Sequence, residues 1–259
     1  MNWSFKDKVA IVTGAGAGMG LATARAFAEA GATVVLADLR EASANAAAEN
    51  LVGAGRRVVA IGCDIADDAQ VAAMVDWIVA TFGRLDAAFN TAGGMSPHSE
   101  TAELGNGARD RMIAAGLHGI SNCTNHELRQ MRRQGGGAIV NCACIDGPAG
   151  CLGSAGSIAS THGANGLTDT AAMDAAANGI RVTEICLDPI SAPVLGSPSH
   201  AAIGCSGEPE EIARAVLWLC SPWARHVMGI PSPWMAAMRR AELRHRSGRA
   251  RSGGMALAR

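Results

Sequence analysis

The chain has 259 residues, of which 49% are hydrophobic, so it is long enough to bury a substantial core as one large α/β domain. Its net charge is −1, but segment 239–259 alone carries +6, which leaves −7 on the rest of the chain and argues against nucleic-acid binding. No run of 18 apolar residues occurs, and Lys6, Asp7 and Lys8 interrupt the N-terminal apolar stretch, so neither a membrane span nor a secretory signal is expected.

Segments with strand and helix patterns alternate along the chain and are joined by short loops. Strands are expected at 9–12, 33–37, 57–61, 85–89, 138–141 and 181–186. Helices are expected at 21–30, 42–53, 71–82, 109–133, 157–177 and 208–219. Repeated β–α units of this kind imply a parallel sheet with helices on both faces.

One domain is expected to span residues 1–237, because no linker or shift in composition divides this part of the chain. The remaining segment, 238–259, is rich in Arg, Gly and Ser and is interpreted as a basic, disordered tail. Binding of an acidic partner by this tail is the alternative.

Eight cysteines are scattered along the chain without any CxxC pair. The spacing therefore predicts neither a zinc site nor a redox-active pair, and no metal is expected. We expect a cytoplasmic protein with free thiols. The cysteines are Cys63, Cys123, Cys142, Cys144, Cys151, Cys186, Cys205 and Cys220.

The first expected strand runs directly into a glycine-rich turn, Thr13–Gly20, which opens a helix. Glycines at such a turn let the backbone approach a pyrophosphate, which then lies on the helix N-terminus. Asp38 ends the second strand, at the position where a carboxylate bonds an adenosine ribose diol and repels a 2′-phosphate, so NAD is preferred over NADP. This context predicts a single-domain, Rossmann-type doubly wound sheet. The expected pyrophosphate-binding residues are Gly14, Gly16, Gly18, Met19 and Gly20.

These motifs resemble those of the short-chain dehydrogenase/reductase family over about residues 6–230. TGAGAGMG at 13–20 fits the family pattern TGxxxGxG, and CDI at 63–65 and NTAG at 90–93 are similar to family motifs. GGGAIVN at 135–141, GIRV at 179–182 and EPEEIARAVLWLCSP at 208–222 continue the likeness. The resemblance implies the family fold and an NAD site. It adds as cofactor contacts Asp64, Ile65, Asn90, Ala92 and Gly93.

The family works through a tetrad of Asn, Ser, Tyr and Lys, and the resemblance places other residues at all four positions. The chain has Gly116 in place of Asn, Cys144 in place of Ser, Ser157 in place of Tyr and Thr161 in place of Lys. The chain contains no tyrosine, and its only two lysines are near the N-terminus, so a shifted alignment does not restore the set.

These replacements remove the chemical groups of the standard reaction. The hydroxyl of Ser157 is shorter than a phenol and a much weaker acid than tyrosine, whose pKa is about 10. Thr161 carries no charge to lower the pKa of a neighbour, and Cys144 is a weaker hydrogen-bond donor than serine. We therefore expect an NAD(H)-binding protein without standard alcohol or carbonyl oxidoreductase activity, which is a pseudoenzyme of its family.

Two alternatives stay open. An active NAD-dependent oxidoreductase with a rebuilt centre would draw on the polar residues expected near the cleft, although each of them also fits a packed, surface or capping role. These residues are His118, Cys144, Asp146, His162 and Asp188. A non-catalytic partner or scaffold subunit is the other alternative. The sequence does not specify a substrate.

The C-terminal part departs from the family in a way that bears on assembly. Asp188 follows Leu187 where the family commonly has Pro-Gly. Pro231 and Pro233 fall where the family has its last strand, and prolines are restricted to edges and bulges of a sheet. A homo-oligomer is possible in principle, but the sequence does not favour the family's standard tetramer.

Overall fold

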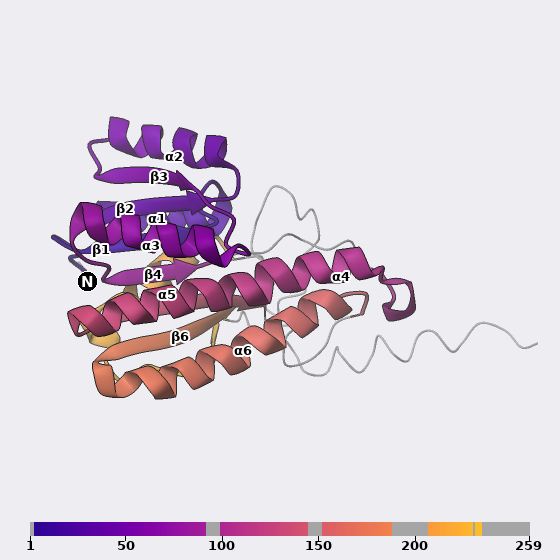
Figure 1. The fold of residues 1–259 in the computed structure, drawn as a ribbon. Helices are drawn as coiled ribbons and strands as arrows, with labels where there is room; N and C mark the ends of the chain where they lie inside the picture. The colour runs from indigo at the N-terminus through magenta and orange to yellow at the C-terminus, as the bar shows by residue number, and fades with distance from the viewer. Residues whose placement is uncertain (1–2, 92–98, 145–151, 188–206, 230, 235–259) are drawn as a thin grey trace, which may run out of the picture.

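The described residues form one sheet of seven parallel strands in the order β3-β2-β1-β4-β5-β6-β7. Figure 1 labels β1 to β4 and β6 of this sheet. The computed structural model describes residues 3–91, 99–144, 152–187, 207–229 and 231–234. The strands are β1 (Val9–Thr13), β2 (Thr33–Asp38), β3 (Val58–Gly62), β4 (Ala87–Asn90), β5 (Gly137–Cys144), β6 (Ile180–Leu187) and β7 (Pro231–Trp234). The order reverses between β1 and β4, which places the ligand crevice of a doubly wound sheet at their carboxyl ends.

Helices cover both faces of this sheet, which confirms the predicted fold class. On one face lie α1 (Gly18–Glu29), α2 (Glu41–Gly53) and α7 (Pro209–Cys220). On the other face lie α3 (Asp68–Phe82), α5 (Gly119–Gln134) and α6 (Ala155–Ala175). Successive residues of a strand point to opposite faces of the sheet and pack in separate hydrophobic cores. Val12 packs with the first helix group and Ile11 with the second.

The helix expected at 109–133 is longer and has an internal change of pitch. α4 (Asn106–Ile113) continues through a π turn at Ala114–His118 into α5. In Figure 1 this long helix runs beside α6 across the sheet. A π turn inside an α-helix is often found at a functional site, and this one includes Gly116.

The last strand, β7, was not predicted, because its prolines argue against regular pairing. β7 pairs in parallel with β6, in the register Glu184↔Pro231 and Cys186↔Pro233, and it is the terminal strand in the order of the sheet. Proline has no backbone N–H group. Because Pro231 and Pro233 are two residues apart, the missing N–H groups fall on the same side of the strand. The open side of an edge strand needs no donor, so β7 is one of the places where the sheet tolerates them.

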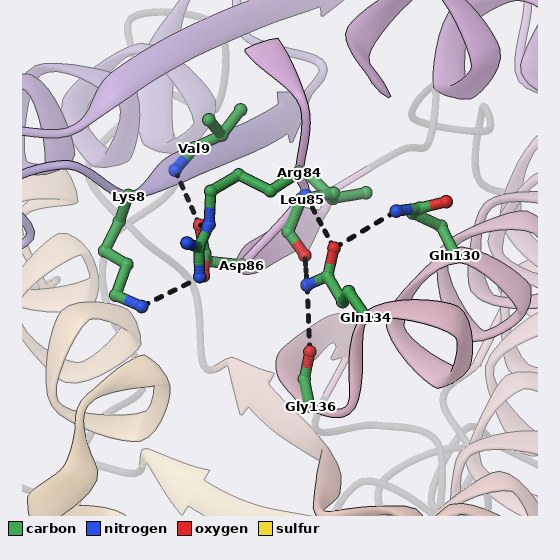
Figure 2. Close-up of polar contacts among 8 residues, drawn as sticks. All are labelled: Lys8, Val9, Arg84, Leu85, Asp86, Gln130, Gln134 and Gly136. Atoms are coloured by element: carbon green, nitrogen blue, oxygen red, sulfur yellow. Dashed lines mark hydrogen bonds and ion pairs between the residues drawn. The ribbon is translucent and has the colours of Figure 1, made fainter. Parts of the chain in front are cut away.

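The amino end of the sheet is held by a network of polar contacts around Asp86 (Figure 2). Its carboxylate accepts hydrogen bonds from Arg84 Nε at 2.7 Å and from Val9 N at 3.0 Å, and it forms an ion pair with Lys8 Nζ at 3.1 Å. The network therefore connects the entries of β1 and β4.

Beside it, the amide of Gln134 connects the start of β4 to the turn before β5. Gln134 Oε1 accepts from Leu85 N at 3.0 Å, while Nε2 donates to Leu85 O at 2.5 Å and to Gly136 O at 2.9 Å (Figure 2). Gln130 Nε2 also donates to Gln134 Oε1, at 3.2 Å. The last turn of α5 is thereby fixed to the sheet.

The expected tail at 238–259 lies outside the described residues, so the division at residue 237 stays a prediction. Within the described part of the chain, no helix has the length and apolar character needed to cross a bilayer.

Candidate functional site

The turn between β1 and α1 has the close backbone packing that the glycine pattern predicts. Gly14 has φ +61°, and a Cβ atom there would collide with the carbonyl oxygen of Thr91 beyond β4. A Cβ at Gly20 would collide with the carbonyl of Gly14. Glycine is therefore required at both positions, and the turn places the N-terminus of α1 at the carboxyl end of the sheet.

Asp38 lies beside this turn and organises it. Its Oδ2 accepts a hydrogen bond from Gly16 N and its Oδ1 accepts one from Arg40 N, each at 2.9 Å. The carboxylate is half-buried, and each oxygen retains a further lone pair for a ligand. The structure thus brings Gly16 and Asp38 together, as the prediction of a ribose contact requires.

Asp64 and Ile65 follow β3 at the same end of the sheet. Asp64 Oδ1 accepts a hydrogen bond from Ala66 N at 3.0 Å, and Oδ2 takes no part in this bond. The side chain of Ile65 is buried, and a Cβ at Gly119 would lie 2.6 Å from its Cδ1 atom. Asn122 Nδ2 donates to Ile65 O at 3.0 Å. The segment predicted to contact adenine is therefore fixed against the start of α5.

Asn90 ends β4, and its side chain is engaged within the protein. The side chain is fully buried, and Nδ2 donates to Glu127 Oε2 at 2.8 Å and to Asn141 Oδ1 at 3.1 Å. Any contribution of Asn90 to a cofactor site would thus come from its backbone. Ala92 and Gly93, predicted to continue the site, lie outside the described residues.

Gly116 and Ser157 lie where the π turn and α6 pack closely together. A Cβ at Gly116 would collide with Ser160 Oγ, and one at Gly163 would lie 2.8 Å from Leu117 Cδ2. Ser157 is half-buried one turn before Ser160, on the same helix. Small residues at these positions allow the two helices to approach each other.

Thr161 is buried on α6, and its backbone carbonyl has a partner one turn along the helix. The amide of Asn165, in the orientation that satisfies both of its ends, donates to Thr161 O and to Glu184 Oε1, each at 2.5 Å. Thr161 itself is uncharged. Through the amide of Asn165 it is linked to the buried carboxyl group of Glu184.

The residues proposed for a rebuilt centre are only partly described. Cys144 is the last residue of β5, opposite Leu187 of β6. His118 and His162 are both exposed, and His162 Nδ1 lies 3.1 Å from Ile158 O of its own helix. Asp146 and Asp188 lie outside the described residues. The structure thus gives the two histidines surface positions.

Three described cysteines, Cys63, Cys123 and Cys220, are buried thiols of the two cores. Burial raises the pKa of Cys63 to about 11 and that of Cys220 to about 12, so both thiols stay protonated at neutral pH. The described residues contain no group of three or more His, Cys, Asp or Glu side chains suited to a metal ion.

A buried row of polar side chains, which the sequence did not predict, crosses the same end of the sheet. Asn90, Asn141 and Glu184 occupy equivalent positions on β4, β5 and β6. We call these three residues and their helical partners the polar row. The partners are Thr124 and Glu127 of α5 and Asn165, Thr168 and Asp169 of α6.

The centre of the polar row is well bonded. Asn141 Nδ2 donates to Thr168 Oγ1 at 2.9 Å and to Thr124 Oγ1 at 3.3 Å. Its Oδ1 accepts from Asn90 Nδ2. The row therefore connects three strands with α5 and α6. Gly116 lies in the π turn before α5, and Ser157 and Thr161 lie on α6.

Comparison with known proteins identifies the family. The family described as short chain dehydrogenase matches residues 8–201, which is most of the chain. The chain belongs to this family. Cis-4-hydroxycyclohexanecarboxylate dehydrogenase of Sinomonas cyclohexanicum is 39% identical over 238 residues, covering 88% of this chain and 95% of the relative. Cyclohexanol dehydrogenase of Acinetobacter sp. (strain SE19) is 35% identical over 235 residues, covering 88% and 94%.

Solved structures of this family share the fold closely. A 7α-hydroxysteroid dehydrogenase complexed with NADH and 7-oxo glycochenodeoxycholic acid has a TM-score of 0.85 at 28% identity, covering 91% of this chain and 96% of its own. An NAD+-bound xylitol dehydrogenase has a TM-score of 0.86 at 27% identity, covering 90% and 99%. The chain is thus a member of an oxidoreductase family, and these two structural neighbours bind NADH or NAD+.

Proposed function

We propose that this short-chain dehydrogenase binds NAD(H) at the turn between β1 and α1 but lacks the proton-transfer groups of its family's standard reaction. The observation that carries the proposal is the contrast between two regions. The glycine turn and Asp38 have the close packing and hydrogen bonds suited to a dinucleotide. By contrast, Thr161 is buried and uncharged, and Gly116 packs directly against Ser160.

NAD(H), when bound, would supply the hydride acceptor or donor. Gly14, Gly16, Gly18, Met19 and Gly20 would hold its pyrophosphate, and Asp38 its ribose. Neither Ser157 nor Thr161, at the family's Tyr and Lys positions, supplies the group that moves the hydroxyl proton of a substrate in the standard reaction. Loss of general acid–base catalysis alone lowers a rate by about 10²–10⁴-fold. Loss of the cation that orients the nicotinamide ribose adds to this.

The two curated relatives suggest the substrate to use as a probe. One is named for a hydroxylated cyclohexane carboxylate and the other for cyclohexanol, so both names specify a cyclohexane-ring alcohol. We propose cyclohexanol and cyclohexanone as the first pair to test. Calorimetric titration with NADH should show saturable binding, while NADH formation from cyclohexanol stays at the buffer baseline.

A restored variant provides the positive control. Combining Cys144→Ser, Ser157→Tyr and Thr161→Lys returns three family groups, and we expect turnover of cyclohexanol at least about 100-fold above that of the unmodified chain. Thr170→Lys, at an exposed site on α6, controls for an added lysine. Turnover by the unmodified chain at the 1–10³ s⁻¹ typical of enzymes would overturn the proposal and favour an active, rebuilt centre.

We also propose that Asp38 makes NAD(H) preferred over NADP(H), because its carboxylate would repel a 2′-phosphate. Asp38→Ser keeps a hydrogen-bonding group but removes the charge. The NADPH-to-NADH ratio of dissociation constants should fall by about tenfold or more, since close like charges cost more than 1.4 kcal/mol. Asp64→Asn, at the predicted adenine contact, should leave the ratio unchanged. An unchanged ratio in Asp38→Ser would remove the basis for the preference.

The remaining expectations belong to the same proposal. We place the functional domain at residues 1–237 and the protein in the cytoplasm, with its basic segment 238–259 available for an acidic partner. Sizing the chain with and without 238–259 tests whether that segment contributes to self-association.

A further inference from the structure

Four oxygen atoms of the polar row are buried and have no hydrogen-bond partner among the described residues. They are Asn90 Oδ1, Glu127 Oε1, Asp169 Oδ1 and Glu184 Oε2. All four are acceptors in the ionised form of the row. A buried acceptor without a donor costs about 1–3 kcal/mol, so four of them in one row require an explanation.

The four atoms belong to two pairs of neighbouring residues. Asn90 and Glu127 are already joined by one hydrogen bond, from Asn90 Nδ2 to Glu127 Oε2 at 2.8 Å, and each has its other oxygen unpartnered. Glu184 and Asp169 interact electrostatically across the contact between β6 and α6, and each has one unpartnered oxygen. Each pair therefore combines two acceptors with at least one carboxyl group.

One proton in each pair would turn one orphan acceptor into a donor. A protonated carboxyl group donates one hydrogen bond, whereas a carboxylate only accepts. A proton on Glu127 Oε1 can be donated to Asn90 Oδ1, which completes a two-point acid–amide pair. A proton on Glu184 Oε2 turns that unpartnered acceptor into a donor and relieves its electrostatic repulsion with Asp169.

We propose that the folded chain retains two protons in the polar row near neutral pH, one donated by Glu127 to Asn90 and one held by Glu184 beside Asp169. The stability of the half of the sheet formed by β4, β5 and β6 is then linked to pH. This half carries α5 and α6, and with them Gly116, Ser157 and Thr161.

In the described part of the chain, no cation is found to contact Glu127 and keep it ionised. On its own helix, Cys123 interacts with it, and from α7 so does Cys220; burial raises the pKa of both thiols, so neither is charged. β4 and β5 present Asn90 and Asn141, which do not titrate. Among the other charged residues of α5, His126 is half-buried and its Nε2 lies 2.9 Å from Asp68 Oδ1 of α3. Arg129, Arg132 and Arg133 are exposed.

Among the described residues, the groups named around Glu184 likewise include no positive charge. α6 contributes Asp169 and the amide of Asn165, and β5 contributes Asn141. β7 consists of Pro-Ser-Pro-Trp and has no ionisable side chain. Arg181 of β6 points to the opposite face, where it donates to Ser221 O at 3.1 Å.

The raised pKa values of Glu127 and Glu184 agree with protonated side chains at these positions. Burial raises the pKa of Glu127 to about 7, although the bond from Asn90 opposes the shift. Burial and then the Asp169 carboxylate raise the pKa of Glu184 to about 8. Unfolded glutamate ionises near pH 4.3. Between these values the folded chain holds protons that the unfolded chain has lost, so stability is greatest below the unfolded pKa and falls as pH rises through the folded pKa.

The test compares urea unfolding at each pH from 5 to 9 for the full chain and three variants. Glu127→Gln replaces the proposed acid by an amide that also donates to Asn90. Glu184→Gln places an uncharged amide beside Asp169. Glu49→Gln, at an exposed site of α2, is the matched control. The ratio of unfolding constants, unmodified chain over variant, should rise about tenfold per pH unit up to about pH 7 for Glu127→Gln and about pH 8 for Glu184→Gln.

For Glu49→Gln this ratio should be flat over the same range. Flat ratios for both buried variants would overturn the proposal, because each carboxyl group would then ionise equally in the folded and unfolded chain. A slope in only one variant would restrict the proposal to that pair and refute the other.

A second measurement needs no variant. In the ¹³C-labelled full chain, NMR titration of the glutamate carboxyl carbons should show two resonances that titrate near neutral pH, apart from the exposed glutamates. In each variant that folds, one of these two titrating resonances should be missing, which assigns it to the substituted glutamate. If every glutamate carbon completes its titration below pH 5 in the folded chain, the two protons do not exist.

Discussion

The two ends of the sheet hold buried polar groups in opposite ways. At the amino end, both oxygens of Asp86 and both ends of the Gln134 amide have partners (Figure 2). At the carboxyl end, the polar row leaves four acceptors unpartnered. The amino end is therefore satisfied by donors that the fold itself supplies, whereas the carboxyl end, where the cofactor turn lies, depends on protons.

The same contrast gives the two ends opposite pH dependences. Burial would raise the pKa of Asp86, but hydrogen bonds from Arg84, Val9 N and Lys8 outweigh it and lower the pKa. The pKa values of Glu127 and Glu184 are raised. Acid should therefore weaken the amino end, and alkali should weaken the carboxyl end. Maximum stability is expected between the two regimes.

The largest effect is expected for Asn141→Ala, at the centre of the polar row. Asn141 is fully buried and bonds to side chains from β4, α5 and α6, so its loss leaves a cavity and several unpaired groups. We expect the free energy of unfolding to fall by about 3 kcal/mol. Urea denaturation measures this loss.

Asn50→Ala, at an exposed site of α2, is the control and should change stability by less than about 0.5 kcal/mol. If Asn141→Ala cost no more than this control, the polar row would contribute nothing to the folded state.

An intermediate effect is expected for Asp86→Asn at the amino end. The substitution keeps the shape but removes the charge that three donors share, so we expect a loss of about 2 kcal/mol at pH 7. Because the folded pKa of Asp86 is lowered, its contribution is present above the unfolded value near 3.9 and is lost as pH falls through the folded pKa.

The difference in stability between the unmodified chain and Asp86→Asn should accordingly shrink on acidification below about pH 4. Asp76→Asn, on the exposed face of α3, should show no such convergence. A constant difference down to pH 2 would mean that the contribution of Asp86 does not come from its charge.

The fold and the dinucleotide side of the site were largely predictable because their signals are local. The run from Val9 to Gly20 specifies a strand, a tight turn and a helix within twelve residues, and Asp38 ends the next strand. The structure places these residues together, with Gly16 N on Asp38 Oδ2. Periodicity and turn chemistry act over short distances along the chain, so a sequence reveals them directly.

The polar row could not be predicted in the same way, because its members are separated by up to about a hundred residues and meet only through the register of three strands. Glu184 does not stand out locally, because its strand also contains Arg181 and Thr183, and its partners are on α6. β7 was missed for the opposite reason, since its local signal, two prolines, argues against the pairing that an edge position permits.

The smallest effect is expected for the exposed cations around Asp86, and it separates the two kinds of contact at the amino end. Lys8 and Arg84 are each 45% exposed, so solvent screens their attraction to Asp86. Lys8→Met should cost about 0.5 kcal/mol, and Arg84→Met about 1 kcal/mol, because the guanidinium bonds both carboxylate oxygens. Both losses should diminish in 1 M salt, whereas the loss in Asn141→Ala should not. Equal salt dependence at the two ends would mean that the polar row is open to ions, and therefore that its four unpartnered oxygens are hydrated rather than protonated.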